Sequence, residues 1–73
     1  MTYEQISEKL IEEGYSIMHQ CYCKTFTLEN PIVGILVTCS PFLLNDVMHE
    51  LWLWLPSEYK VSKQDEQTIL IKK

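Results

Sequence analysis

Residues 40–56 read SPFLLNDVMHELWLWLP, and they decide the fold class because LWLWL by itself also fits a strand. Leu44, Val47 and Leu51 lie three and four residues apart, which places all three on one side of a helix. The Ser-Pro pair is typical of an N-cap followed by proline in the first turn, and the final proline stops a helix. The stretch therefore predicts a helix over residues 41–55.

This predicted helix has one apolar face and one polar face. The apolar face is expected to pack on the core and consists of Leu43, Leu44, Val47, Met48, Leu51, Trp54 and Leu55. The opposite face carries the polar residues Asn45, Asp46, His49 and Glu50.

Three large apolar side chains interrupt the polar face. Phe42 and Leu53 fall in its middle, and Trp52 falls on its flank. A cluster of Trp, Leu and Phe with a polar rim is typical of a protein interface. We therefore predict a protein-binding surface, whose residues are Phe42, His49, Trp52 and Leu53. The alternative is that the C-terminal hairpin covers this face.

The segments before this helix predict three strands. Residues 32–39, IVGILVTC, are apolar and β-branched, which favours a central strand buried on both faces. Residues 15–28 are rich in Tyr, Ile, Thr and Phe, but their apolar alternation shifts phase near residues 19–23. We therefore expect strands at residues 15–20 and 24–29, with a bulge or a turn between them.

The chain begins with a predicted helix over residues 3–13. Thr2 and Gln5 have the spacing of a capping box, and Gly14 is a typical residue just past a helix end. One side of this helix is an acidic row, interpreted as a solvated face or, alternatively, as a contact for a basic partner. The row consists of Glu4, Glu8 and Glu12.

After the second helix, residues 58–63 and 67–72 predict two strands around the polar turn 64–66. The element order is therefore αβββαββ. We expect an α+β fold in which residues 1–73 form a single domain, with a mainly antiparallel sheet and two helices packed on it.

Composition narrows the classes of function. The 73 residues carry a net charge of −4, with six lysines and no arginine, which disfavours nucleic-acid binding. Three cysteines argue against a closed disulfide framework, and free thiols suggest a reducing compartment, so we expect a cytoplasmic protein. The N-terminus shows no signal-peptide pattern, and residues 41–55 are too short and too polar to span a membrane.

The stretch HQCYCK, residues 19–24, could form a metal or thiol site with Cys39 and His49. Structural zinc sites usually place two to four residues between paired cysteines, whereas one residue separates Cys21 from Cys23. A cysteine in a strand more often behaves as a small buried apolar side chain. We therefore expect no catalytic residue, no metal and no cofactor, with a Cys/His metal-binding protein as an alternative.

The run EKLIEEGYSIMHQCYCKTFTLENP, followed by VTCSP and a helix, resembles the HicA-type toxin nucleases over residues 8–55. That family has small αβββα domains of double-stranded-RNA-binding type, with a Gly-aromatic pair, here Gly14-Tyr15, after the first helix. Its catalytic histidine lies in a Gly-Ser-His turn, where this chain has the sequence CYCK. The resemblance therefore implies the fold and does not imply nuclease activity.

These observations predict a non-enzymatic interaction module, acting as a small modulator or inhibitor of another protein. It is expected to bind another protein or itself through the second helix or a sheet edge, with no membrane contact and no small-molecule substrate. The alternative is a nucleic-acid-binding domain of double-stranded-RNA-binding-like (HicA-like) fold without nuclease activity. Its candidate contacts are Lys24, Lys60, Lys63, Lys72 and Lys73, with Tyr22 or Tyr59 for stacking.

Overall fold

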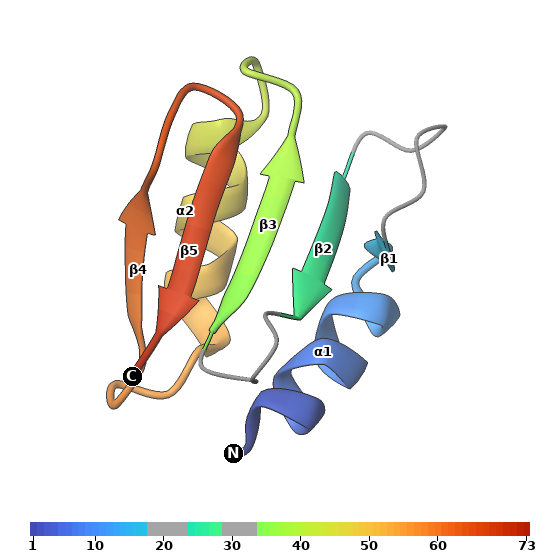
Figure 1. Cartoon of the computed structure of the whole chain (residues 1–73), viewed down its shortest axis with the longest axis vertical. Coiled ribbons are helices and arrows are strands. Elements are labelled where there is room, and N and C mark those ends of the chain that lie inside the picture. Colours follow the sequence, from blue (N-terminus) through green and yellow to red (C-terminus); the bar gives the residue numbers. More distant parts are fainter. Residues whose placement is uncertain (18–23, 29–33) are drawn as a thin grey trace.

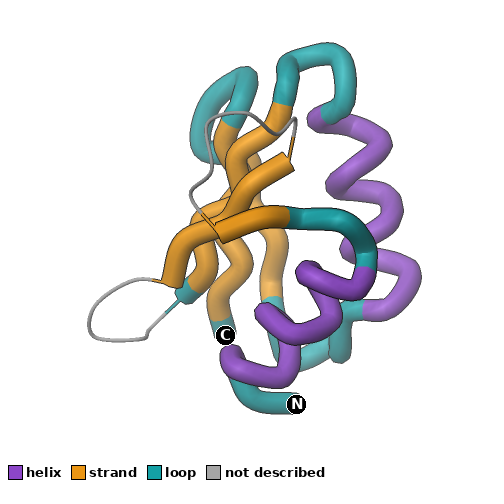
Figure 2. Tube along the Cα trace, turned by 90° about the vertical axis from the view of Figure 1, so that its right-hand side faces the viewer, coloured by secondary structure: helices purple, strands orange, loops and turns teal. Residues whose placement is uncertain are grey.

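Both helices pack on one face of a five-stranded sheet (Figures 1 and 2). This arrangement comes from a computed structural model that describes residues 1–17, 24–28 and 34–73. The elements are α1 (Tyr3–Glu12), β1 (Ser16–Ile17), β2 (Lys24–Leu28), β3 (Ile35–Cys39), α2 (Leu44–Trp54), β4 (Lys60–Lys63) and β5 (Thr68–Lys72). The α+β class and the order αβββαββ are confirmed.

The strands lie in the order β1-β2-β3-β5-β4, so β3 is central. β1 pairs with β2 in parallel, and the other three pairings are antiparallel. Figure 1 shows α2 behind β5 and β3, with α1 toward the β1–β2 side. The bulge or turn predicted near residues 19–23 lies outside the described residues, as does the second half of the predicted strand 15–20.

The ends of α1 follow the local signals of the sequence. Thr2 Oγ1 accepts a hydrogen bond from the Gln5 backbone N–H at 3.2 Å, and Gln5 Oε1 accepts one from the Thr2 N–H at 2.8 Å, which completes the capping box. Gly14 has φ +94°, a conformation that glycine adopts without strain. The N–H of Tyr15 then donates to the Leu10 carbonyl oxygen at 2.9 Å, so the helix ends in a Schellman motif.

Only one face of the central strand β3 is buried, so the prediction of burial on both faces is wrong. Ile35, Val37 and Cys39 point into the core, whereas Leu36 is half-buried and Thr38 is exposed. The reason is that both helices lie on the same face of the sheet (Figure 2). The sheet side of the core consists of Phe26, Ile35, Val37, Cys39, Ile69 and Ile71.

α2 is helical as predicted, but it begins three residues later than the Ser-Pro signal indicates. The backbone N–H of Leu43 donates to the Ser40 carbonyl oxygen at 2.9 Å, which closes a tight turn before the helix. Leu43 is therefore the N-cap, and Ser40 is not. The predicted core face is confirmed, since Leu44, Val47 and Leu51 are buried.

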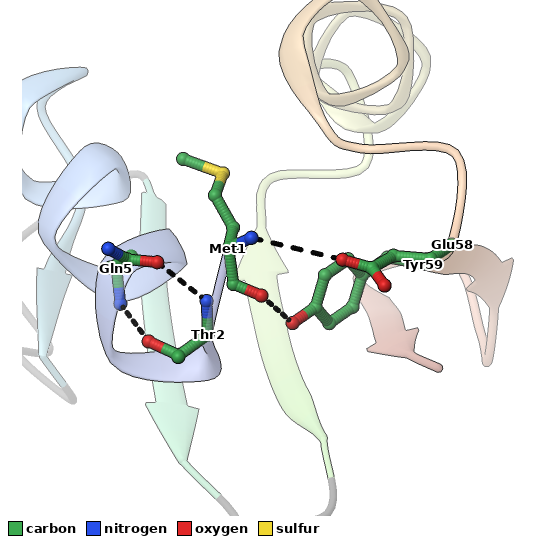
Figure 3. Close-up of polar contacts among 5 residues, drawn as sticks. All are labelled: Met1, Thr2, Gln5, Glu58 and Tyr59. Carbon is green, nitrogen blue, oxygen red and sulfur yellow. Dashed lines mark hydrogen bonds and ion pairs between the residues drawn. The ribbon is translucent and has the colours of Figure 1, made fainter.

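The two ends of the chain meet beside β4. Figure 3 shows the Tyr59 hydroxyl, which donates to the Met1 carbonyl oxygen, and the Met1 ammonium 3.8 Å from the Glu58 carboxylate. The Lys73 N–H donates to the Tyr3 hydroxyl at 3.1 Å, and the rings of Tyr3 and Tyr59 pack edge to face with centroids 5.4 Å apart. These contacts join α1 to the β4–β5 hairpin.

Neither helix in the described part of the chain is long and apolar enough to cross a bilayer; α2, the longer one, has 11 residues.

The opposite environments of two leucines in α2 give a stability prediction. Leu51 is fully buried and Leu53 is 73% exposed. Leu51→Ala leaves a cavity in the core, and we expect it to lower the free energy of unfolding by about 3 kcal/mol, whereas Leu53→Ala should change it by less than about 0.5 kcal/mol. Urea unfolding at low micromolar protein concentration measures both. Equal losses would show that Leu53 belongs to the chain's own core.

Candidate functional site

The outward side of α2 exposes three large apolar side chains. Phe42, in the turn before the helix, is 94% exposed, and the exposed fractions of Leu53 and Trp52 are 73% and 62%. Asp46 and His49 are also exposed. All four residues predicted as a binding surface thus lie at the surface of the molecule. We define the α2 outer surface as Phe42, Asp46, His49, Trp52 and Leu53.

The C-terminal hairpin does not cover the α2 outer surface, so that alternative is wrong. β4 and β5 are strands of the sheet, and the core side of α2 packs on that sheet (Figure 1). Since side chains on a helix follow one another at about 100°, burying Val47 and Leu51 turns Leu53 to the opposite side. The exposure of Leu53 therefore follows from the packing of its neighbours.

Three residues of the α2 outer surface lie in one line along the helix. Asp46, His49 and Leu53 are spaced by three and four residues on α2. Phe42, four residues before Asp46, extends this order from the turn that precedes the helix, so the acid and the histidine lie between two apolar side chains. Sequence analysis found the two apolar ends and His49 but did not single out Asp46, although the four-three-four spacing was visible.

The two tryptophans of α2 have different roles. Trp54 is half-buried on the core, and Lys9 Nζ of α1 lies 6.0 Å from its ring centroid, a cation–π contact. Lys9 also pairs with Glu13 at 3.2 Å. Trp54 therefore belongs to the contact between the two helices, whereas Trp52 is left open to solvent.

The cysteine and histidine residues of the described chain are not brought together. Cys39 is a buried free thiol on the core face of β3, and His49 is exposed on the outward side of α2. His19, Cys21 and Cys23 lie outside the described residues. Within the described ranges, no three His, Cys, Asp or Glu side chains are grouped to hold a metal ion.

The corner around Tyr15 holds the chain's most perturbed titratable groups. Burial raises the pKa of the Tyr15 hydroxyl well above its usual value, and the charges of Glu50 and Cys39 add to this effect. Burial also raises the pKa of the Cys39 thiol, against the opposing effect of Lys24. Lys24 Nζ lies 4.6 Å from the Tyr15 ring centroid. Sequence analysis missed this corner because its members come from the connection between α1 and β1, from β2 and from β3, and they meet only in the folded chain.

Of the lysines proposed for nucleic-acid contact, those of the C-terminal hairpin lie together and Lys24 lies apart from them. Four of the six lysines lie between residues 60 and 73, and Lys60 and Lys72 are register partners on β4 and β5. Lys24 lies on β2, where it pairs with Cys39 of the central strand β3. It is therefore separated by β3 from the lysines of β4 and β5. Tyr59 is 5% exposed, so the proposal that it stacks on bases is wrong, and Tyr22 lies outside the described residues.

Comparison of the chain with protein-family models, curated proteins and solved structures gave no match.

A pH prediction follows from Tyr15, whose hydroxyl is buried without a hydrogen-bond partner among the described residues. Its raised pKa means that the folded state keeps this proton at a pH where the unfolded state has lost it. Stability is therefore fully present below about pH 10 and falls as the pH rises above it. Tyr15→Phe removes this contribution.

We expect wild type to lose up to about 1 kcal/mol more unfolding free energy than Tyr15→Phe between about pH 8 and pH 10.5. At about pH 8 the variant should be as stable as wild type or more stable, because no hydrogen bond within the described chain is lost. Urea unfolding followed by circular dichroism at both pH values measures this. A large loss of stability at pH 8 would show that the hydroxyl has a partner.

Proposed function

We propose that this chain is a non-enzymatic protein-interaction module that binds its partner through the α2 outer surface. It acts as a small modulator or inhibitor by covering part of the partner, in a reducing compartment such as the cytoplasm, which suits the free thiol of Cys39. One observation carries the proposal: Phe42, Trp52 and Leu53 are exposed on a helix whose opposite side completes the core.

The exposed apolar side chains are a source of binding energy that the fold does not use. Burying one Leu or Phe side chain contributes about 1.5–3 kcal/mol, and tryptophan is the residue most enriched among interface hot spots. Asp46 and His49 lie between the apolar groups and give the surface polar contacts that orient a partner.

The β4 edge of the sheet is less suited to binding than α2. β4 is an edge strand with a lysine at each end, Lys60 and Lys63. Charged edge strands disfavour pairing with a further strand. This comparison favours the helix over the β4 edge as the binding surface.

The described residues support a binding role over thiol catalysis. A thiol nucleophile needs a base within hydrogen-bond reach, and His49 projects from the side of α2 opposite the core that contains Cys39. The raised pKa of Cys39 lowers its thiolate fraction at neutral pH.

Site-specific photocrosslinking tests the proposal. With benzoylphenylalanine in place of His49, illumination of cells that express the chain should give an adduct of one defined mass, because position 49 lies at the centre of the surface. Trp52→Ala in the same chain should reduce that adduct about tenfold or more, since a hot-spot tryptophan carries much of the binding energy.

The matched control places the photoreactive residue at Glu8, which is exposed on α1. This position should give only weak, heterogeneous labelling. Equal labelling at positions 49 and 8, or an adduct at 49 that does not depend on Trp52, would contradict binding through α2.

A second candidate function is nucleic-acid binding by the β4–β5 hairpin. The observation in its favour is that Lys60 and Lys72 lie side by side in the sheet register, with Lys73 next to Lys72 and Lys63 at the other end of β4. Against it stand the net charge of −4 and the burial of Tyr59.

Fluorescence anisotropy with a double-stranded RNA separates this candidate from the first. Binding by the hairpin should weaken steeply between about 50 and 200 mM salt, because lysine–phosphate contacts release counterions. Lys60→Glu combined with Lys72→Glu should abolish it, whereas Leu53→Asp should not. Absence of binding at about 50 mM salt removes the candidate.

A further inference from the structure

We infer that the partner of the α2 outer surface is a second copy of this chain, with the two α2 helices packed antiparallel about a two-fold axis. The inference rests on the proposed function, since it names the occupant of the same surface. A two-fold interface requires that one surface contain both members of every contact pair. The α2 outer surface meets this requirement.

The order of residues along the helix is self-complementary when it is read in opposite directions. If the axis passes midway between Val47 and Met48, Phe42 of one copy faces Leu53 of the other. The same alignment places Asp46 opposite His49. The four-three-four spacing therefore matches apolar residues with apolar residues and an acid with a histidine, at both ends of one pairing.

The polar pair at the centre of this line can form a hydrogen bond. His49 has a ring N–H in either protonation state, and it can donate to the Asp46 carboxylate of the second copy. The acid at the centre of the surface thus meets a hydrogen-bond donor, which limits the cost of removing it from water.

The two ends of the pairing are apolar. At each end Phe42 of one copy meets Leu53 of the other, and the exposed Trp52 lies beside Leu53 on the flank of its own helix. Two apolar clusters of this kind enclose the polar centre and exclude water from it.

A parallel arrangement is disfavoured by charge. Parallel helices about a two-fold axis bring each residue close to its own copy, so that Asp46 meets Asp46 and Glu50 meets Glu50. Like charges at this spacing repel, and each copy already has a net charge of −4. The antiparallel register instead places each Asp46 opposite His49 of the other copy.

The exposed area sets the expected strength. Phe42, Trp52 and Leu53 together expose on the order of 450 Å² in each copy, judged from the size of aromatic side chains. Two copies then bury on the order of 1,000 Å² in total, which is near the lower limit for a specific interface. We therefore expect a reversible dimer with a dissociation constant on the order of 10 µM.

Sedimentation equilibrium of the full chain tests the dimer and its register. Wild type should change from monomer to dimer between about 1 and 500 µM, the range that an interface of this size implies. Asp46→Lys places a cation opposite His49, and His49→Glu places an anion opposite Asp46. Each variant alone should therefore dimerise about tenfold or more weakly.

An equimolar mixture of the two variants is the decisive sample. In the mixed dimer Lys at position 46 faces Glu at position 49, and the other end keeps the natural Asp46–His49 pair. The mixture should recover dimerisation to within about threefold of wild type, because the two changes compensate only when they are in contact. Glu8→Lys, on exposed α1, is the matched charge control and should leave dimerisation unchanged.

The other possible results separately contradict the antiparallel register and the choice of a second copy as the partner. A mixture that stays as weak as its components, or single variants that dimerise like wild type, overturns the antiparallel register. Wild type that stays monomeric throughout overturns the second copy as the partner. If the crosslink at position 49 is then still formed with a different protein, the proposed function stands without the dimer. Circular dichroism melting of each variant confirms that it is folded.

Discussion

The packing of α2 on the sheet, through Leu44, Val47 and Leu51, is the contact on which the rest of the structure depends. These side chains meet the inner face of the central strands and thereby set the rotation of the helix about its own axis. Once that rotation is set, the side chains on the other side of the helix face the solvent. The exposure of Trp52 and Leu53 is thus a direct consequence of how the core is filled.

A two-layer domain of this size has three outward faces, and they differ in character. The open face of the sheet carries threonines such as Thr25, Thr27 and Thr38 around the half-buried pair Leu36 and Leu70, and the outward side of α1 is mainly acidic. The α2 outer surface differs because its apolar groups are large and gather at the two ends of a polar line. This contrast is the basis for proposing α2 as the binding surface.

The most perturbed titratable side chains of the described chain lie inside the fold, where they contribute to packing. Cys39 and Tyr15 are buried, and the ammonium of Lys24 lies over the Tyr15 ring. Burial raises the pKa of both acidic groups, so each stays protonated and neutral at physiological pH. Reactive side chains enclosed in the core and an apolar helix surface outside are the arrangement expected of a module that acts by contact.

Local interactions explain what the sequence alone determined: the helices, the αβββαββ order, and the side of α2 that faces the core. Capping, turn chemistry and helical periodicity act within a few residues, so they can be read without knowing what lies nearby. The tertiary structure decided the rest. The start of α2 at Leu44 depends on the turn closed by the Ser40 carbonyl oxygen. The exposure of Thr38 arises because both helices pack on the same face of the sheet. The burial of Tyr59 against the N-terminus joins residues 58 positions apart, a contact that no local pattern can specify.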